Sequence, residues 1–197
     1  MPTWLSSSLR CCSIITFSLA LAACDGGAPR FKSTDITGAE YGKSLELPDT
    51  SGRVRRLEDF RGKAVVLFFG FTHCPDVCPT TLADLATVMK TLGPDAERVQ
   101  VLFITVDPER DTPGELAQYV GAFDPRFLAL RGDLAATQRV AKDFKIYFEK
   151  RKQGDSYTVD HSAQSYVIDP QGRLRLLVRH DRIAQDLAPD LQAILRG

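Results

Sequence analysis

Two stretches of the chain are almost continuously apolar, one over residues 64–70 and the other over residues 99–106. Runs of this kind are typical of strands that are covered on both faces, as in parallel sheets flanked by helices. Between the two runs, four apolar residues recur at helical spacing: Leu82, Leu85, Met89 and Leu92. Gly93-Pro94 then marks the end of this helix. The pattern therefore predicts a strand–helix–strand unit with a right-handed crossover.

Two more helices are predicted after this unit. One begins at Thr112, which is placed as the N-cap, with Pro113 at the first helical position. Glu115 is the expected partner of Thr112 in a capping box. The other helix is predicted over residues 133–144, where apolar side chains again recur at helical spacing.

The last third of the chain alternates between short apolar runs and turn residues. Strands are predicted over residues 146–149, 157–159, 164–168 and 174–178. The turn sequence Asp169-Pro170-Gln171-Gly172 is expected to join the last two of them into a hairpin. The apolar residues that follow Ile183 predict a closing helix, broken near Pro189 because proline lacks a backbone N–H.

Residues 45–47 and 53–57 flank a turn ahead of the first buried strand, and are expected to form an added hairpin. The order is thus a βαβ unit, further helices, a β-hairpin and a closing helix. This order fits an α/β fold, a thioredoxin-like sandwich with a central mixed sheet, an N-terminal β-hairpin addition and a mid-chain insertion.

The N-terminus carries a ten-residue apolar run, Ile14–Ala23, preceded by Arg10 and a Ser-rich stretch. Because a bilayer span needs about 20 apolar residues, the run fits a signal peptide better than a transmembrane helix. It ends in Leu21-Ala22-Ala23-Cys24, which resembles a bacterial lipoprotein cleavage box. The alternative is an ordinary signal peptide that happens to be followed by a cysteine.

The predicted organisation is therefore a signal peptide over residues 1–23, a lipidated tether over residues 24–40 and a folded domain over residues 41–197. Cys24 would become the lipidated first residue of the mature chain. The protein is then expected at the bacterial cell membrane, held by lipid and facing the periplasm.

The numbers of basic and acidic residues are equal, with 25 Lys plus Arg and 25 Asp plus Glu, so the charge balance does not predict nucleic-acid binding. The chain has five cysteines. Two of them leave with the predicted signal peptide and Cys24 carries lipid. Only Cys74 and Cys78 would then remain as free thiols.

Cys74 and Cys78 follow the first buried strand directly, and each of them precedes a proline. Pro79 suits the first helical position, so Cys78 is predicted as the N-cap and Cys74 in the preceding loop. The helix dipole would then favour thiolates at both positions. Such a pair can exchange electrons as a disulfide or hold a soft metal ion, and the spacing alone leaves both roles open.

His161, in Asp160-His161-Ser162, stands just before a predicted strand, where thioredoxin-like oxidoreductases place a cis-proline against their cysteine pair. The chain has no proline between Asp155 and Asp169. A lone loop histidine is ordinarily a solvated or hydrogen-bonded side chain. Opposite the cysteine loop, however, one imidazole and two thiolates make a soft ligand set that suits Cu(I) and also holds Cu(II).

Three segments together resemble the Sco/SenC family of copper-delivery proteins for cytochrome c oxidase. They are F-F-G-F-T-H-C-P-D-V-C-P-T-T-L from Phe68, V-D-P-E-R-D-T-P from Val106, and D-H-S from Asp160 leading into Y-V-I-D-P-Q-G from Tyr166. The resemblance implies a thioredoxin-like fold and a copper site formed by Cys74, Cys78 and His161. It also implies copper delivery to the binuclear copper site of the oxidase. Many members keep a transmembrane anchor, whereas this chain is expected to use lipid.

Other polar residues near these motifs are weaker candidates. Asp160 could orient His161, Asp107 could orient the metal loop or a partner, and Asp76 could add negative potential near a metal ion. Turn formation explains Asp107 equally well, and loop aspartates such as Asp76 are usually solvated. His73 adjoins Cys74, but neighbouring residues rarely point at one metal ion, and His180 is expected on the surface.

Two functions remain in competition. The first is a copper metallochaperone without turnover of its own, whose partners would be the copper-site subunit of the oxidase and possible further copper chaperones. The second is a membrane-tethered thiol–disulfide reductase that maintains the cysteines of the oxidase copper site. Both need an external thiol reductant, because the copper-binding thiols must stay reduced in an oxidising compartment. A copper or redox sensor would need a signalling partner that the sequence does not reveal.

Peroxiredoxin and hydrolase activities lack their motifs. A peroxiredoxin loop needs a proline and a threonine ahead of its cysteine, and Leu67 and Phe71 occupy those positions. A cysteine hydrolase needs a histidine base and a third member, and the sequence supplies no recognisable set.

Overall fold

The structure is a computed structural model that describes Met1 and residues 30–197. The predicted signal peptide after Met1, Cys24 and the first part of the predicted tether lie outside the described residues. Within residues 30–197, no helix combines the length and the apolar character needed to cross a membrane.

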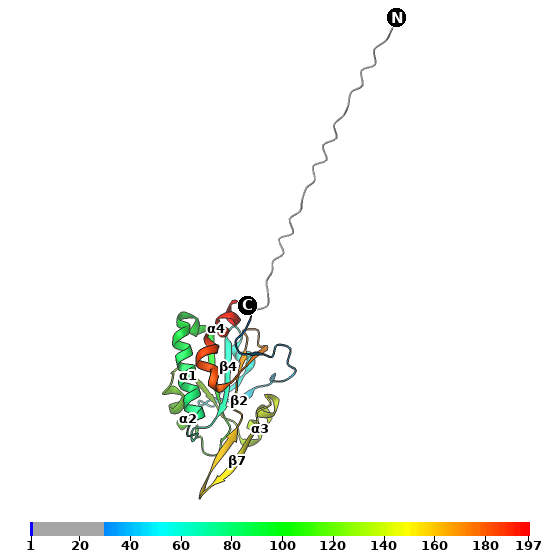
Figure 1. The fold of residues 1–197 in the computed structure, drawn as a ribbon. Coiled ribbons are helices and arrows are strands. Elements are labelled where there is room, and N and C mark those ends of the chain that lie inside the picture. The colour runs from blue at the N-terminus through cyan, green and yellow to red at the C-terminus, as the bar shows by residue number, and fades with distance from the viewer. Residues whose placement is uncertain (2–29) are drawn as a thin grey trace.

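A six-stranded mixed sheet forms the centre of the domain, with the strand order β1-β10-β9-β4-β5-β6 (Figure 1). The strands are β1 (Thr34–Asp35), β4 (Ala64–Gly70), β5 (Val99–Thr105), β6 (Leu128–Leu130), β9 (Ser165–Ile168) and β10 (Leu174–Val178). The strands β4, β5 and β6 run parallel, while β9 lies antiparallel to β4 on its other side. Every residue of β4 is buried, as the continuous apolar run predicts.

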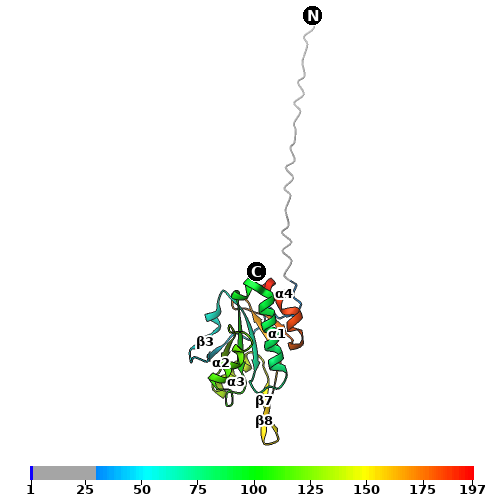
Figure 2. The same ribbon diagram turned by 90° about the vertical axis from the view of Figure 1, so that its left-hand side faces the viewer.

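Helices cover both faces of this sheet. The helix α1 (Val77–Leu92) connects β4 to β5 and lies beside α4 (Ile183–Arg196), as both views show (Figures 1 and 2). The helix α2 (Pro113–Gly121) packs along β6, and α3 (Leu134–Asp143) lies beside β2 (Glu46–Pro48). The apolar residues predicted for the core face of α1 are all buried: Leu82, Leu85, Met89 and Leu92. The thioredoxin-like α/β sandwich is therefore confirmed.

Several local predictions are also confirmed. Thr112 caps α2, and it exchanges hydrogen bonds with Glu115 as a capping box, with Pro113 at the first helical position. The strands β2 and β3 (Val54–Arg56) form the N-terminal hairpin. The strands β9 and β10 pair through a turn in which Gly172 N–H donates to the carbonyl of Asp169.

The prediction that the closing helix breaks near Pro189 is wrong, because α4 runs unbroken through this residue. Pro189 is exposed, and so is Gln185, whose carbonyl lacks the N–H that a non-proline residue at 189 would donate. That carbonyl can bond to water, which removes most of the cost of proline within a helix.

The expected domain boundary at residue 41 falls inside the packed structure. The strand β1 pairs with β10, and the backbone N–H groups of Lys32 and Ser33 donate to the carboxylate of Asp190 at 2.8 Å. The sequence did not predict β1 or β6, because strands of two or three residues carry too short a pattern.

The strands β7 (Phe148–Gln153) and β8 (Ser156–His161) form a separate hairpin that projects from the body (Figures 1 and 2). Both are longer than predicted, and β7 begins two residues later than predicted. Most of their side chains are charged or polar, so apolar alternation does not mark them. The hairpin turns at Gly154, whose φ of +57° glycine adopts without strain.

Candidate metal centre

The cysteine segment joins the end of β4 to the start of α1. Cys74 lies in the loop, and Cys78 lies in the first turn of the helix, because the N-cap is Asp76. The prediction of Cys78 as N-cap is therefore wrong by two residues. Pro79 fits at the third helical position equally well, since the first N–H groups of a helix have no intrahelical partner. The N–H of Cys78 instead donates to Cys74 Sγ at 3.4 Å.

The two cysteines differ in exposure. Cys78 is completely buried, whereas Cys74 is partly open to solvent. Gly70 makes room for Cys78, because a Cβ at this position would lie 2.8 Å from Cys78 Sγ and 2.8 Å from Phe103 Cε2. The last residue of β4 thus allows α1 to begin directly against the sheet.

His161 reaches the cysteines from the opposite side, at the end of β8. Its ring packs edge-on against Phe71 and Phe68, with centroid distances of 5.8 Å and 6.3 Å. Its Nε2 lies 3.5 Å from Cys78 Sγ, and its Nδ1 lies 3.0 Å from the carbonyl oxygen of Ser162. In the tautomer that donates Nδ1–H to this carbonyl, the Nε2 lone pair faces the sulfur atoms, as a metal-ligating imidazole requires.

The structure thus brings together the three side chains predicted as ligands. One ligand atom from each of Cys74, Cys78 and His161 lies within 4.8 Å of the other two. Two sulfurs and one imidazole nitrogen form a donor set that selects soft ions such as Cu(I), and hard ions such as Mg²⁺ prefer oxygen.

The cysteine pair shares one proton in its reduced, metal-free state. The Cys78 thiol donates a hydrogen bond to Cys74 and lowers the pKa of Cys74 well below its usual range, against the effect of burial. His161 and the backbone N–H groups of Asp76 and Cys78 also lower this pKa. The pKa of Cys78 is raised, because its proton is held by Cys74 and because it is buried. Cys74 is therefore the partly exposed thiolate, and binding of a soft metal ion would release the proton from Cys78.

Asp111 holds the cysteine loop in place, although its sequence context does not mark it as a residue of the site. Its buried carboxylate accepts hydrogen bonds from Thr72 Oγ1 at 2.6 Å and from Thr105 Oγ1 at 2.5 Å. The N–H of Thr72 also donates to it, at 3.2 Å. Asp111 precedes the N-cap Thr112 in the sequence, but that position does not reveal that its side chain points toward another loop.

The weaker candidates lie around this cluster rather than in it. Asp76 is exposed, and Asp160 is exposed and pairs with Arg151, with 3.1 Å between Oδ2 and Nε. Asp107 is buried, and its carboxylate contacts Arg110 and Tyr157. His73 is half-exposed beside Thr72, and His180 is exposed at the start of a short 3₁₀ helix. The hydrogen-bond partner of His161 is thus the Ser162 carbonyl and not the carboxylate of Asp160.

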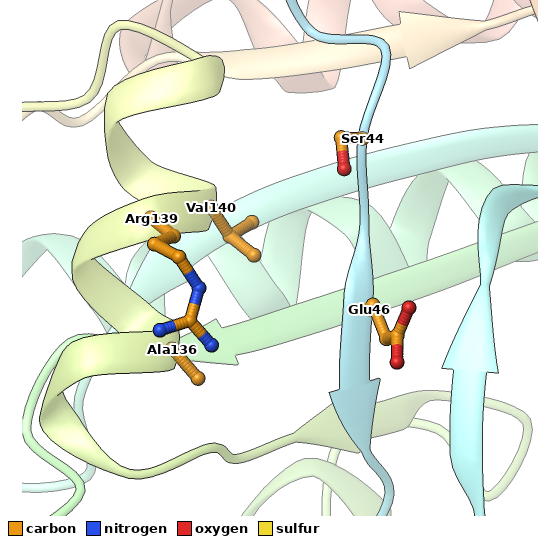
Figure 3. A pocket seen from close by; sticks show the side chains of 5 residues that line it. All are labelled: Ser44, Glu46, Ala136, Arg139 and Val140. Atoms are coloured by element: carbon orange, nitrogen blue, oxygen red, sulfur yellow. The ribbon is translucent and has the colours of Figure 1, made fainter.

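A recess of about 240 Å³ opens at the cluster, and Phe71, Cys74, Asp76, Thr158 and His161 are among its lining residues. A second recess, of about 350 Å³, lies between α3 and β2. Figure 3 shows its lining: Ser44, Glu46, Ala136, Arg139 and Val140. None of these five side chains is a cysteine or histidine, so the soft-metal chemistry belongs to the first recess.

The bovine mitochondrial protein SCO2 homolog is 45% identical over 132 residues, which are 65% of this chain and 50% of that protein. The chain spans about half to three fifths of the length of the first curated relatives that it matches.

Solved structures are similar over more of the chain. The apo Sco1 protein of Thermus thermophilus is 40% identical, with a TM-score of 0.75, over 86% of this chain and 99% of that one. ScoI of Bradyrhizobium japonicum, solved with copper bound, is 38% identical, with a TM-score of 0.71, over 77% of this chain and 98% of that one.

The sequence profile of one protein family, described as SCO1/SenC, matches residues 33–196. The match therefore includes the whole six-stranded sheet, the cysteine loop and the hairpin that carries His161. With this match, and with relatives that share both sequence and fold, the chain belongs to the SCO1/SenC family.

Proposed function

We propose that this protein binds copper through Cys74, Cys78 and His161 and delivers it to the binuclear copper site of cytochrome c oxidase. The observation that carries the proposal is the convergence of two sulfurs and one imidazole nitrogen within 4.8 Å. ScoI of Bradyrhizobium japonicum, which has a similar fold, has been solved with copper bound. The family resemblance implies the recipient.

The exposure of the three ligands suits transfer better than storage. Cys74 and His161 line an open recess, and only Cys78 is fully buried. A partner's thiolate could therefore approach the ion from the open side before the original ligands leave.

Thiol–disulfide reduction is the second candidate, and one observation favours it. The partly exposed Cys74 is held as a thiolate beside the buried thiol of Cys78, which is the arrangement of an attacking and a resolving cysteine. Cys74 would attack a disulfide of the oxidase copper-site subunit, and Cys78 would then close the Cys74–Cys78 disulfide and release the reduced partner. Each cycle consumes two electrons, which a separate thiol reductant must return.

Copper transfer to the oxidase subunit tests the first candidate. We expect the reduced protein to bind about one copper ion per chain and to lose it to the metal-free copper-site domain of the oxidase. Copper in each separated protein would be measured by atomic absorption. Cys74→Ser and Cys78→Ser should each fail to load. Wild-type protein that loads copper and keeps it in the presence of an excess of that domain would contradict delivery.

We also propose that Cys24 carries lipid and holds the domain at the periplasmic face of the bacterial membrane. The support is the sequence Leu21-Ala22-Ala23-Cys24 after a short apolar run. We expect mass spectrometry of the mature protein to find an acylated Cys24 as its first residue. We expect Cys24→Ala to accumulate as a precursor. Processing of Cys24→Ala to the wild-type length would contradict the proposal.

A further inference from the structure

His161 is carried by a hairpin that is not part of the central sheet. The strands β7 and β8 pair only with each other, and they project from the body (Figure 1). Most of their side chains are exposed, and the apolar packing of the hairpin on the body is limited to the buried Val159 and the partly buried Phe148 and Tyr157. Isolated two-stranded hairpins are marginally stable in water. Nevertheless, His161 Nε2 lies 3.5 Å from Cys78 Sγ, so other contacts must hold β8 in place.

Arg110, in the loop after β5, contacts β8 in two ways. Its guanidinium lies over the ring of Tyr157, 3.8 Å from the centroid, and its Nη1 donates to the backbone carbonyl of Tyr157 at 2.9 Å. Cation–π contacts and hydrogen bonds from a charged donor are both stronger than their neutral counterparts, especially when partly buried. The side chain of Arg110 is 22% exposed.

Asp107 is buried and contacts both Arg110 and Tyr157. Its carboxylate accepts from Arg110 Nε and, at 2.9 Å, from the hydroxyl of Tyr157. The side chain of Asp107 is fully buried, so these two donors take the place of water at its carboxylate. Asp107, Arg110 and Tyr157 thus form a closed set, which we call the latch, between the body and β8.

The latch acts on the same face of β8 that presents His161. Tyr157, Val159 and His161 are alternate residues of one strand, so their side chains point to the same side. Phe71, at the end of β4, lies between the two positions. Its ring centroid is 5.9 Å from the Arg110 guanidinium and 5.8 Å from the His161 ring.

We propose that Arg110 is a positioning residue, which acts through the latch to hold β8 and thereby fix His161 against Cys74 and Cys78. The inference rests on the proposed copper site. The ligand motifs alone do not show how His161 is held in place. Because this third ligand lies on a projecting hairpin, it needs a separate connection to the body of the domain. Without the latch, His161 would be in ligating position for only a fraction of the time, and the apparent affinity would fall by that fraction.

The experiment compares Arg110→Gln, Tyr157→Phe and a control in the full-length reduced protein. The control is Arg151→Gln, because Arg151 lies on the other face of the same hairpin and pairs with the exposed Glu149 and Asp160. The first measurement is hydrogen exchange of the β7–β8 amides in metal-free protein. The second is a Cu(II) titration in which pulsed EPR detects the coordinated imidazole, with His161→Ala as the reference.

We expect Arg110→Gln to exchange its hairpin amides faster and to bind Cu(II) about tenfold more weakly, with a reduced imidazole signal. Tyr157→Phe keeps the ring beneath the guanidinium and should show the same changes to a smaller extent. It also carries the test if Arg110→Gln does not fold. Arg151→Gln should match wild type in both measurements.

Wild-type exchange in both latch variants would overturn the latch. Faster exchange with wild-type affinity and imidazole signal would overturn the positioning role. Failure of the proposed copper site gives a different result, in which wild type and His161→Ala have the same Cu(II) spectrum. Faster hairpin exchange in Arg110→Gln would then still support the latch and would remove its link to a metal ligand.

Discussion

Replacing Gly70 by alanine is expected to displace Cys78 and to weaken copper binding more than tenfold, because the new Cβ would lie 2.8 Å from the Cys78 sulfur. Phe103 Cε2 lies equally close on the other side, so neither neighbour can yield without moving buried structure. Overpacking of this kind costs about 1–3 kcal/mol of the free energy of unfolding. Copper titration and denaturant unfolding of the same preparation measure the two effects.

The matched control for Gly70→Ala is Gly121→Ala. Gly121 is the last residue of α2, and a Cβ there would meet no heavy atom within 4 Å. Helical alanine is more stable than helical glycine by about 0.5–1 kcal/mol, so this variant should bind copper normally and unfold no more easily. If Gly70→Ala bound copper as tightly as Gly121→Ala, the contact between β4 and the cysteine turn would not set the position of Cys78.

Strong periodicity explains which parts of the fold could be predicted. The runs at 64–70 and 99–106 are buried on both faces, and the helix between them buries one regular stripe, so local pattern and final environment agree. The hairpin of β7 and β8 gives no such signal, because its charged side chains face solvent and its support comes from Arg110, far away in the sequence. Its extent could not be predicted from its own residues.

The site shows the same limit. The residue types at Cys74, Cys78 and His161 indicate soft-metal chemistry without any coordinates. The groups that orient these ligands cannot be found in this way. The Ser162 carbonyl and the N–H of Cys78 are backbone groups, which almost any residue type at these positions would also carry. Asp111 and Asp107 both follow β5, and only the folded loops determine that one supports the cysteine segment and the other the hairpin. Side-chain direction in loops is a tertiary property.

Replacing His161 by alanine should separate copper transfer from thiol reduction. Loss of one of three ligands is expected to weaken copper retention by about 100-fold or more, since even the partners of ligands contribute 10–100-fold. The side chain is partly exposed at the end of β8, so its removal opens no core cavity. Cells that carry His161→Ala should therefore lose oxidase activity in low copper and recover part of it, by mass action, when copper is added.

The same substitution should leave the disulfide chemistry largely intact. A reductase needs only the two sulfurs. The hydrogen bond from the Cys78 thiol is the largest cause of the lowered pKa of Cys74, and His161 adds a smaller contribution in the same direction. We expect His161→Ala to form and reduce the Cys74–Cys78 disulfide in a glutathione redox titration, whereas Cys74→Ser and Cys78→Ser cannot. His180→Ala, at an exposed histidine outside the cluster, is the matched control and should behave as wild type in both assays.

If cells with His161→Ala kept near-normal oxidase activity in low copper, and only the cysteine variants lost it, reduction and not copper transfer would be the essential step. If His161→Ala lost activity with its redox titration unchanged, the third ligand, and hence the metal, would be what the oxidase requires.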